Sequence, residues 1–407
     1  RTLAGSVSVR GALNGAVTLT GNAKISGTVT GPVDLGANTL SLASGLISGA
    51  ISGTGGVQLG TDYALARLTG VNSYTGPTIV ALSPSYTYNN RAQIDGIQTG
   101  SAVTVALNPG WGNHRLSGSG SLGAVVVEPS GSCSSATDVN CNQLSPGQSD
   151  GSATGQMTTA GLQMKSNTRL ILQLNGAIPG SGYDQLVVNG AVDFAGGPRL
   201  DVFLGYVPAL GQVFRIVDNG GGAAVVGSFA GLAEGATLTS SYSVVLQVSY
   251  AGGDGNDVTL TATSVPKIWT GAVNGLWSEP GNWTGGVPGA GDVLQFPVSA
   301  SSKSMTNDLF AGTVFNRIEW YGTGYTIIGN AFGLTNGISN SGTNTISVAV
   351  ALSGGTASGG SLTFSGAMTL SGNVSVTGAL DGAVTLTGNA KISGTGTGPV
   401  DLGANTL

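Results

Sequence analysis

The stretch GALDGAVTLTGNAKISG, residues 378–394, repeats residues 11–27 with one substitution. The match extends without a gap over residues 1–40 and 368–407, at a constant offset of 367. Such near-identity predicts one unit, plus an overlap, of a longer tandem array in which Leu407 takes the place of Leu40. The alternative is two similar coils within one finite domain. The copies differ at Arg1/Met368, Ala4/Ser371, Ser6/Asn373, Arg10/Thr377, Asn14/Asp381 and Val29/Gly396.

Short segments of residues 1–53 alternate apolar and small polar residues, and Gly ends most of them. A period of two is typical of strands with one buried face, whereas the 71 Gly residues disfavour helix. Strands so short and evenly spaced predict an all-β fold, a parallel β-helix or β-solenoid with Gly corners and protruding loops. We expect about 20–25 residues per coil. Tandem β-sandwich modules are the alternative.

The composition excludes several classes of protein. Hydrophobic residues make up 40% of the chain and charged residues only 8%, which is the opposite of the balance found in disordered chains. Collagen is excluded because Pro is scarce and Gly is irregularly spaced. No apolar run approaches the roughly 18 residues of a transmembrane helix. A net charge of −5 with scattered Lys and Arg predicts no nucleic-acid partner.

Three parts of the chain resemble bacterial surface proteins. Residues 51–60 and 68–80, ISGTGGVQLG and LTGVNSYTGPTIV, resemble the autotransporter-associated β-strand repeat. Residues 161–262 are similar to passenger modules, and the Trp spacing of residues 268–296 resembles the opening of repeat units in large repetitive surface proteins. The resemblance implies a right-handed β-helical passenger or adhesin on a bacterial surface.

Composition and these resemblances divide the chain into five predicted segments. They are a β-solenoid segment at 1–128, a polar loop at 129–160, a passenger-like module at 161–264, a Trp-rich seam at 265–298 and a second solenoid segment at 299–407.

Cys133 and Cys141 lie close together in a stretch rich in Ser, Gly and Asn. We expect a local disulfide between them, which would indicate an oxidising, extracellular setting. Two free thiols in a loop are the alternative. The chain opens on Arg1 without a signal peptide, so we expect a mature, processed or partial chain.

A possible metal site lies at GGDGND, residues 252–257. Asp254, Asn256 and Asp257 partly match the calcium-binding nonapeptide, whose stacked turns bind Ca²⁺ through Asp and carbonyl oxygens. The match is imperfect because Thr259 stands at an apolar position and only one copy is present. We favour a β-turn with its carboxylates in water over the calcium site, and no other cofactor is expected.

Trp269, Trp277 and Trp283 fall within fifteen residues of one another. Exposed Trp rings stack on sugars, which would make this stretch a glycan platform. Buried Trp rings fill a large volume and need a partner for the indole N–H. We favour the buried arrangement, a plug that closes the β-helix where one repeat unit meets the next.

Catalytic residues are not expected. The one histidine, His114, has no evident partner, and GQSDG at residues 147–151 lacks the strand and helix of a nucleophile elbow. The acidic residues are isolated, whereas glycosidases need paired carboxylates. A polysaccharide-degrading β-helix therefore stays the least favoured alternative.

Taken together, these features predict a structural repeat unit of a bacterial extracellular fibre, sheath or surface adhesin. Its partner would be itself, end to end through stacked β-helix coils and laterally between fibres. A glycan-binding adhesin that uses exposed Trp residues, with surface glycans as partners, is the alternative.

Overall fold

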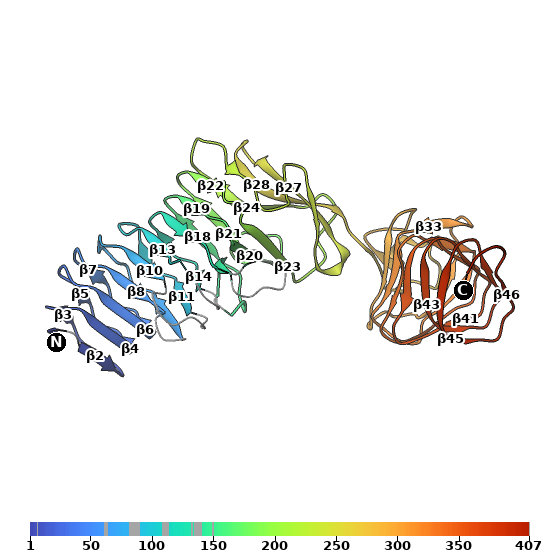
Figure 1. The fold of residues 1–407 in the computed structure, drawn as a ribbon, viewed down its shortest axis with the longest axis horizontal. Coiled ribbons are helices and arrows are strands. Elements are labelled where there is room, and N and C mark those ends of the chain that lie inside the picture. The colour runs from blue at the N-terminus through green and yellow to red at the C-terminus, as the bar shows by residue number, and fades with distance from the viewer. Residues whose placement is uncertain are drawn as a thin grey trace. The chain divides into compact units, whose positions relative to one another are not determined.

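The computed structural model describes residues 1–406 except residue 6 and residues 61–63, 81–89, 108–113, 132, 134–140 and 149. Two compact units make up the chain, Arg1–Thr263 and Ser264–Leu407 (Figure 1), and their boundary falls within one residue of the predicted seam. In the described residues, helix is limited to two one-turn 3-10 helices, η1 (Ser241–Ser243) and η2 (Pro280–Asn282). The prediction of an all-β protein is confirmed.

Three sheets build the first unit. The smallest has four described strands, β1 (Thr2–Leu3), β3 (Val17–Leu19), β5 (Val33–Asp34) and β7 (Ile51–Ser52). The largest has 16 described strands: β2 (Val7–Arg10), β4 (Ala23–Val29), β6 (Leu40–Ile47), β8 (Val57–Leu59), β9 (Leu65–Leu68), β10 (Thr78–Val80), β11 (Asn90–Ile94), β13 (Val103–Val105), β14 (His114–Gly118), β16 (Val125–Val127), β17 (Asn142–Pro146), β19 (Leu162–Met164), β20 (Thr168–Leu174), β22 (Val192–Phe194), β23 (Arg199–Leu204) and β25 (Val226–Gly227). The third has eight: β12 (Ile97–Gln98), β15 (Ser121–Leu122), β18 (Gln156–Thr159), β21 (Gln185–Val188), β24 (Val213–Asn219), β26 (Thr237–Thr239), β27 (Val245–Gly252) and β28 (Asp257–Ser264).

Two sheets build the second unit. Twelve described strands form the larger: β29 (Lys267–Trp269), β30 (Trp283–Thr284), β31 (Val293–Phe296), β32 (Ser304–Asn307), β34 (Arg317–Trp320), β35 (Thr326–Gly329), β37 (Gly337–Asn340), β38 (Thr343–Ile346), β40 (Gly355–Ser358), β41 (Ser361–Phe364), β43 (Val374–Leu380) and β45 (Ala390–Gly396). Six form the smaller: β33 (Thr313–Phe315), β36 (Phe332–Leu334), β39 (Val350–Leu352), β42 (Met368–Leu370), β44 (Val384–Leu386) and β46 (Val400–Asp401).

Long parallel ladders run through both units. Each pass of the chain, called a rung here, pairs with the rung before it. Val17 pairs with Val33, sixteen residues later, whereas Val125 pairs with Leu162 across a much longer excursion. The rungs of the duplicated segment are therefore shorter than the expected 20–25 residues. Parallel ladders are compatible with a β-helix or solenoid and differ from the antiparallel sheets of the β-sandwich alternative.

Antiparallel pairing flanks the boundary between the units. In the first unit, β24 pairs antiparallel with β28, and β26 with β27. In the second unit, β29 pairs antiparallel with β30. One sheet of each unit therefore ends here in strands of reversed direction, which do not offer the same edge to a further parallel rung.

Part of the predicted polar loop at 129–160 belongs to the ladders instead. Asn142–Pro146 forms β17, which pairs with β14 and β20, and Gln156–Thr159 forms β18. The prediction was wrong here because it equated polar composition with exposure. Asn142 is fully buried, and its amide donates to the carbonyl oxygens of Ala106 and Glu128.

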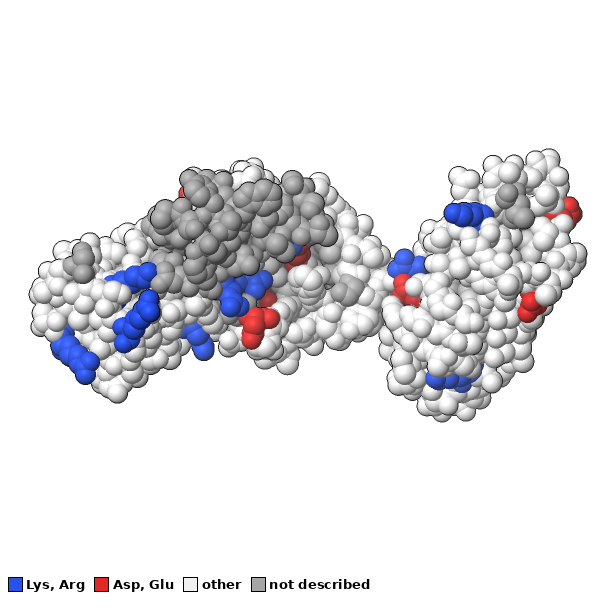
Figure 2. Space-filling model, turned by 60° about the horizontal axis from the view of Figure 1, so that its bottom comes forward, with Lys and Arg blue, Asp and Glu red and all other residues white. Residues whose placement is uncertain are grey.

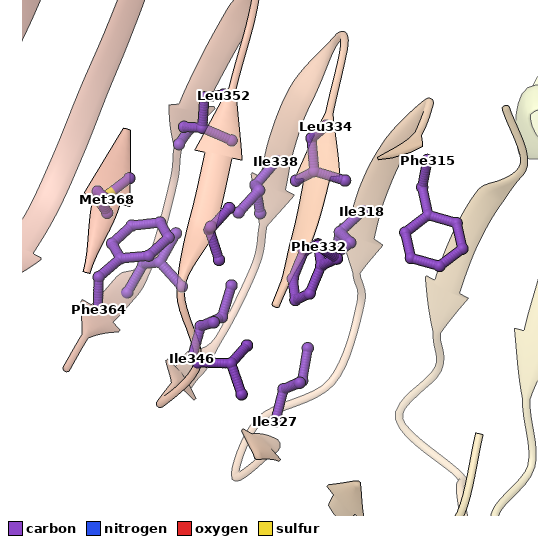
Figure 3. Close-up of a cluster of buried hydrophobic side chains, with 14 of the residues drawn as sticks. Phe315, Ile318, Ile327, Phe332, Leu334, Ile338, Ile346, Leu352, Phe364 and Met368 are labelled. Atoms are coloured by element: carbon purple, nitrogen blue, oxygen red, sulfur yellow. The ribbon is translucent and has the colours of Figure 1, made fainter. Parts of the chain in front are cut away.

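The core is built from rows of apolar side chains that stack from rung to rung. In the second unit, Ile327 pairs with Ile346, which pairs with Phe364, and all three are buried. Figure 3 shows these side chains pointing between the ribbons toward a second row that contains Phe332 and Met368. The period-two pattern of each short strand thus repeats in register along the ladder, which gives a continuous apolar interior.

Glycine is required where rungs turn. In the first unit, a Cβ built on Gly49 would overlap the carbonyl oxygen of Gly31, and a Cβ on Gly70 would overlap that of Gly49. The same close approach continues at Gly96 and Gly120. The backbones of neighbouring rungs touch at this corner, so a side chain there would force the rungs apart.

Replacing Gly49 with Ala should destabilise the first unit by about 3 kcal/mol, because the new methyl group meets rigid backbone. Gly15→Ala is the matched control, since a Cβ at Gly15 meets nothing within 4 Å. Thermal unfolding followed by circular dichroism should show a lowered midpoint for Gly49→Ala alone. Equal midpoints for both variants would contradict the corner packing.

Candidate functional site

The two forty-residue copies adopt the same strand register. Thr2 pairs with Thr18 in the first copy, and Thr369 pairs with Thr385 in the second. These are equivalent pairs at the offset of 367. The side-chain contacts repeat as well: the Asn38 amide donates to the carbonyl oxygen of Leu19 at 3.0 Å, and its counterpart Asn405 donates to Leu386 at 2.9 Å. The same sequence therefore builds the same rungs in both units.

The copies are covered on opposite sides. In the first copy, β4 pairs with β6 and β5 with β7, so later rungs cover it. In the second copy, β42 pairs with β39 and β43 with β40, so earlier rungs cover it. In the part of the chain that is described, no strand pairs with the remaining side of β1, β2, β45 or β46. Leu407 lies outside the described residues.

A shallow polar groove occurs at the same place in each copy. In the first it has a volume of about 380 Å³ and is lined by Ser8, Asn22, Lys24, Thr39 and Gln58, among others. In the second it has a volume of about 610 Å³ and includes the counterparts of the first four of these residues. On the face drawn in Figure 2, Lys, Arg, Asp and Glu are few and scattered over a largely uncharged surface.

The three Trp residues of the seam lie inside the second unit. Trp269 and Trp277 are fully buried, and Trp283 is 5% exposed. Trp283 packs edge-on against both, with ring centroids 5.0 Å from Trp269 and 5.8 Å from Trp277. Its indole N–H donates to the carbonyl oxygen of Trp277, and that of Trp269 donates to Ser302. None of the three rings offers the exposed face that glycan stacking requires.

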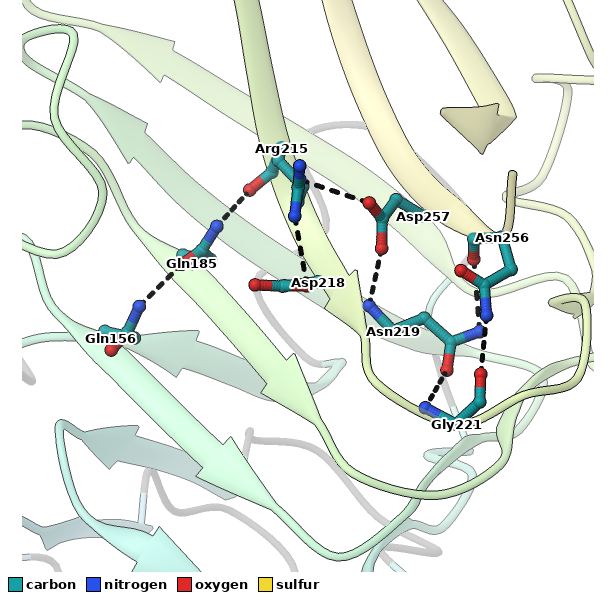
Figure 4. Close-up of polar contacts among 8 residues, drawn as sticks. All are labelled: Gln156, Gln185, Arg215, Asp218, Asn219, Gly221, Asn256 and Asp257. Atoms are coloured by element: carbon teal, nitrogen blue, oxygen red, sulfur yellow. Dashed lines mark hydrogen bonds and ion pairs between the residues drawn. The ribbon is translucent and has the colours of Figure 1, made fainter. Parts of the chain in front are cut away.

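The possible calcium residues join a different network, shown in Figure 4. Asp257 is 1% exposed, and its carboxylate accepts from the Asn219 backbone N–H at 2.8 Å and lies 3.1 Å from Arg215 Nε. The guanidinium supplies the positive charge that a calcium ion would bring. The amide of Asn256 donates to the carbonyl oxygen of Gly221, while Asp254 is exposed.

This network fastens the antiparallel strands to the last parallel rungs. The Gln156 amide donates to Gln185 Oε1, and the Gln185 amide donates to the Arg215 carbonyl oxygen (Figure 4). Within the described ranges, no group of three or more His, Cys, Asp or Glu could hold a metal ion. The expected β-turn with carboxylates in water is wrong for Asp257, which is buried and paired.

Cys133 and Cys141 form a disulfide with their Cα atoms 4.9 Å apart. The bridge closes a short segment between β16 and β17. His114 is buried, its Nδ1 lies 3.1 Å from the Ala106 carbonyl oxygen, and burial lowers its pKa. The Ser of the GQSDG stretch lies outside the described residues.

Asp184 was not singled out by its sequence context. Its carboxylate accepts from the backbone N–H groups of Gly155 and Gln173, at 2.8 and 2.9 Å. Burial raises the pKa of this carboxyl to about 7, although both hydrogen bonds oppose the shift. Asp184 therefore joins two segments of the ladder. Arg215 was also missed, because a contact between residues so far apart in the chain leaves no local pattern.

No family model matches the chain, and no curated protein or solved structure is found to be similar to it. The resemblance to autotransporter repeats therefore stays a prediction. The described part of the chain contains no helix that is long and apolar enough to cross a membrane.

Arg215→Met should destabilise the first unit by about 2–3 kcal/mol, because it leaves the buried Asp257 carboxylate without its counter-charge. Asp218→Asn is the matched control, since it removes only the exposed partner of the same guanidinium and should change stability by less than about 0.5 kcal/mol. Chemical denaturation measures the free energy of unfolding of both variants.

A chelator should leave the denaturation midpoint of the wild-type protein unchanged. A midpoint lowered by the chelator would restore the calcium hypothesis.

Stability should fall as the pH rises from about 4 to about 7 because of Asp184. The carboxyl is protonated in both states below its unfolded pKa of about 3.9. Between that value and the native pKa of about 7, only the unfolded state releases the proton, so the native state loses relative stability. Asp184→Asn cannot titrate, so its stability difference from wild type should change over this range. A pH-independent difference would refute the assignment.

Proposed function

We propose that this chain is a structural protein: a closed, right-handed parallel β-helix that forms the repeat unit of a bacterial extracellular fibre, sheath or surface adhesin. One observation carries the proposal. The same forty residues form the last rungs of one unit and the first rungs of the other in identical register, with opposite sides covered. A sequence that accepts neighbours on both sides is suited to a repeating array.

Assembly would be self-templating. Each open parallel edge presents a row of backbone N–H and C=O groups, which in an isolated protein favours uncontrolled association. In an array, the same edge selects a rung of matching register. Short side chains and a charged content of 8% allow rungs and neighbouring fibres to pack closely. The disulfide between Cys133 and Cys141 supports an oxidising location, as expected for a cell-surface protein.

The proposal assigns no catalytic residue and no cofactor to the chain. The three buried carboxylates of the described residues have structural partners: Asp257 contacts Arg215, Asp184 accepts two backbone hydrogen bonds, and Glu319 accepts from the Gln295 amide. The glycan-binding alternative required an exposed ring at Trp277 or Trp283, and both rings are buried. A structural role is therefore better supported than either alternative.

Aligned samples of the native repeat array should diffract X-rays near 4.8 Å along the fibre axis, because the backbone hydrogen bonds between rungs would run in that direction. Fibre diffraction of a dried, oriented sample provides the measurement. A reflection at right angles to the axis, or native arrays that give no ordered reflection near 4.8 Å, would contradict end-to-end assembly.

A further inference from the structure

We infer that residues 41–60 of a second copy of this repeat unit pair with the open edge of β45 and β46. Residues 264–407 of one copy and residues 41–263 of the next then form a single solenoid. The inference rests on the proposed function and deepens it by naming the partner segment, its register and the limits of the joined domain.

The backbone register follows from the first copy. There, Lys24 pairs with Ser41 and Val33 pairs with Ile51. Lys391 and Val400 are the counterparts of Lys24 and Val33 in the second copy, and they continue the same ladder from β43 and β44. The edge therefore offers the same donors and acceptors that bind β6 and β7 in the first unit.

Apolar burial favours the same partner. Val400 is 46% exposed and Leu402 is 41% exposed, whereas their counterparts Val33 and Leu35 are fully buried beneath the next rung. The opposite edge shows the converse. Val7 is partly exposed in β2, while its counterpart Val374 is only 3% exposed. Each edge thus exposes side chains that the other copy buries, and covering them is favourable.

Corner glycines also stack in the second unit, at Gly366, Gly382 and Gly398, and the stack would continue into the second copy. A Cβ on Gly398 would overlap the carbonyl oxygen of Gly382, and a Cβ on Gly382 would overlap that of Gly366. In the first copy, Gly49 follows Gly31, the counterpart of Gly398, with the same overlap. The incoming segment therefore places Gly49 directly on Gly398, where no larger residue fits.

Antiparallel strands lie at the far ends of the joined domain. The second unit begins with the antiparallel pair of β29 and β30 beside the buried Trp rings, and the first unit ends in the antiparallel strands β26, β27 and β28. At these ends the described strands β23, β25, β32 and β33 also end their sheets, with parallel pairing on one side only. Each solenoid would then start at one seam and finish at the next, instead of running unbroken through the array.

The test uses the full chain with the sequence of residues 41–60 appended after Leu407. Hydrogen exchange followed by mass spectrometry reads the amides of residues 390–401, and residues 23–34 of the same molecule serve as the covered reference. The appended segment should slow exchange at 390–401 at least tenfold, toward the reference rate. The matched control carries Gly49→Ala in the appended segment and should leave these amides as fast as in the unextended chain.

Two outcomes would overturn the inference: unchanged exchange at residues 390–401 with the native extension, or equal slowing by the native and Gly49→Ala extensions. Neither outcome depends on fibre formation. Failure of the edge pairing is therefore distinguishable from failure of the proposed function, which the fibre diffraction experiment tests separately.

Discussion

Neighbouring rungs approach each other backbone to backbone at the corner glycines, and this contact limits how the coils can stack. At Gly31, Gly49 and Gly70, one rung lies so near the next that a methyl group would overlap a carbonyl oxygen. Rungs held at this distance can share hydrogen bonds along the ladder and stack their apolar side chains in rows. Rows of buried side chains such as Ile327, Ile346 and Phe364 form only when consecutive rungs stack in register.

The ladders have two kinds of end, and they differ in what they allow. Antiparallel strands end the eight-stranded sheet of the first unit, and an antiparallel pair beside a buried aromatic cluster ends the twelve-stranded sheet of the second. The duplicated rungs instead leave parallel edges with partly exposed apolar residues such as Val400 and Leu402. Closed ends limit association, whereas open edges of defined register direct it. The proposed array would account for the near-identity of the two copies, because both would accept the same neighbours.

Much of the fold could be predicted from local pattern. Period-two alternation in segments such as residues 17–19 identified short strands, and the duplication identified the equivalent rungs. The sixteen-residue spacing of Gly15 and Gly31 equals the observed length of these rungs, which is shorter than the predicted length of about 20–25 residues. Contacts between distant residues left no such signal. Arg215 meets Asp257 only because β24 and β28 pair antiparallel, and polar residues 142–146 are buried by neighbours that composition does not reveal.

We propose that neighbouring repeats share one set of duplicated rungs. Electron cryomicroscopy of the native assembly, at a resolution that separates rungs about 4.8 Å apart, would count these sets. We predict one set of these rungs per repeat, with the rung of β39 on one side and that of β7 on the other. Two adjacent sets, or a gap beside β45 and β46, would contradict the claim.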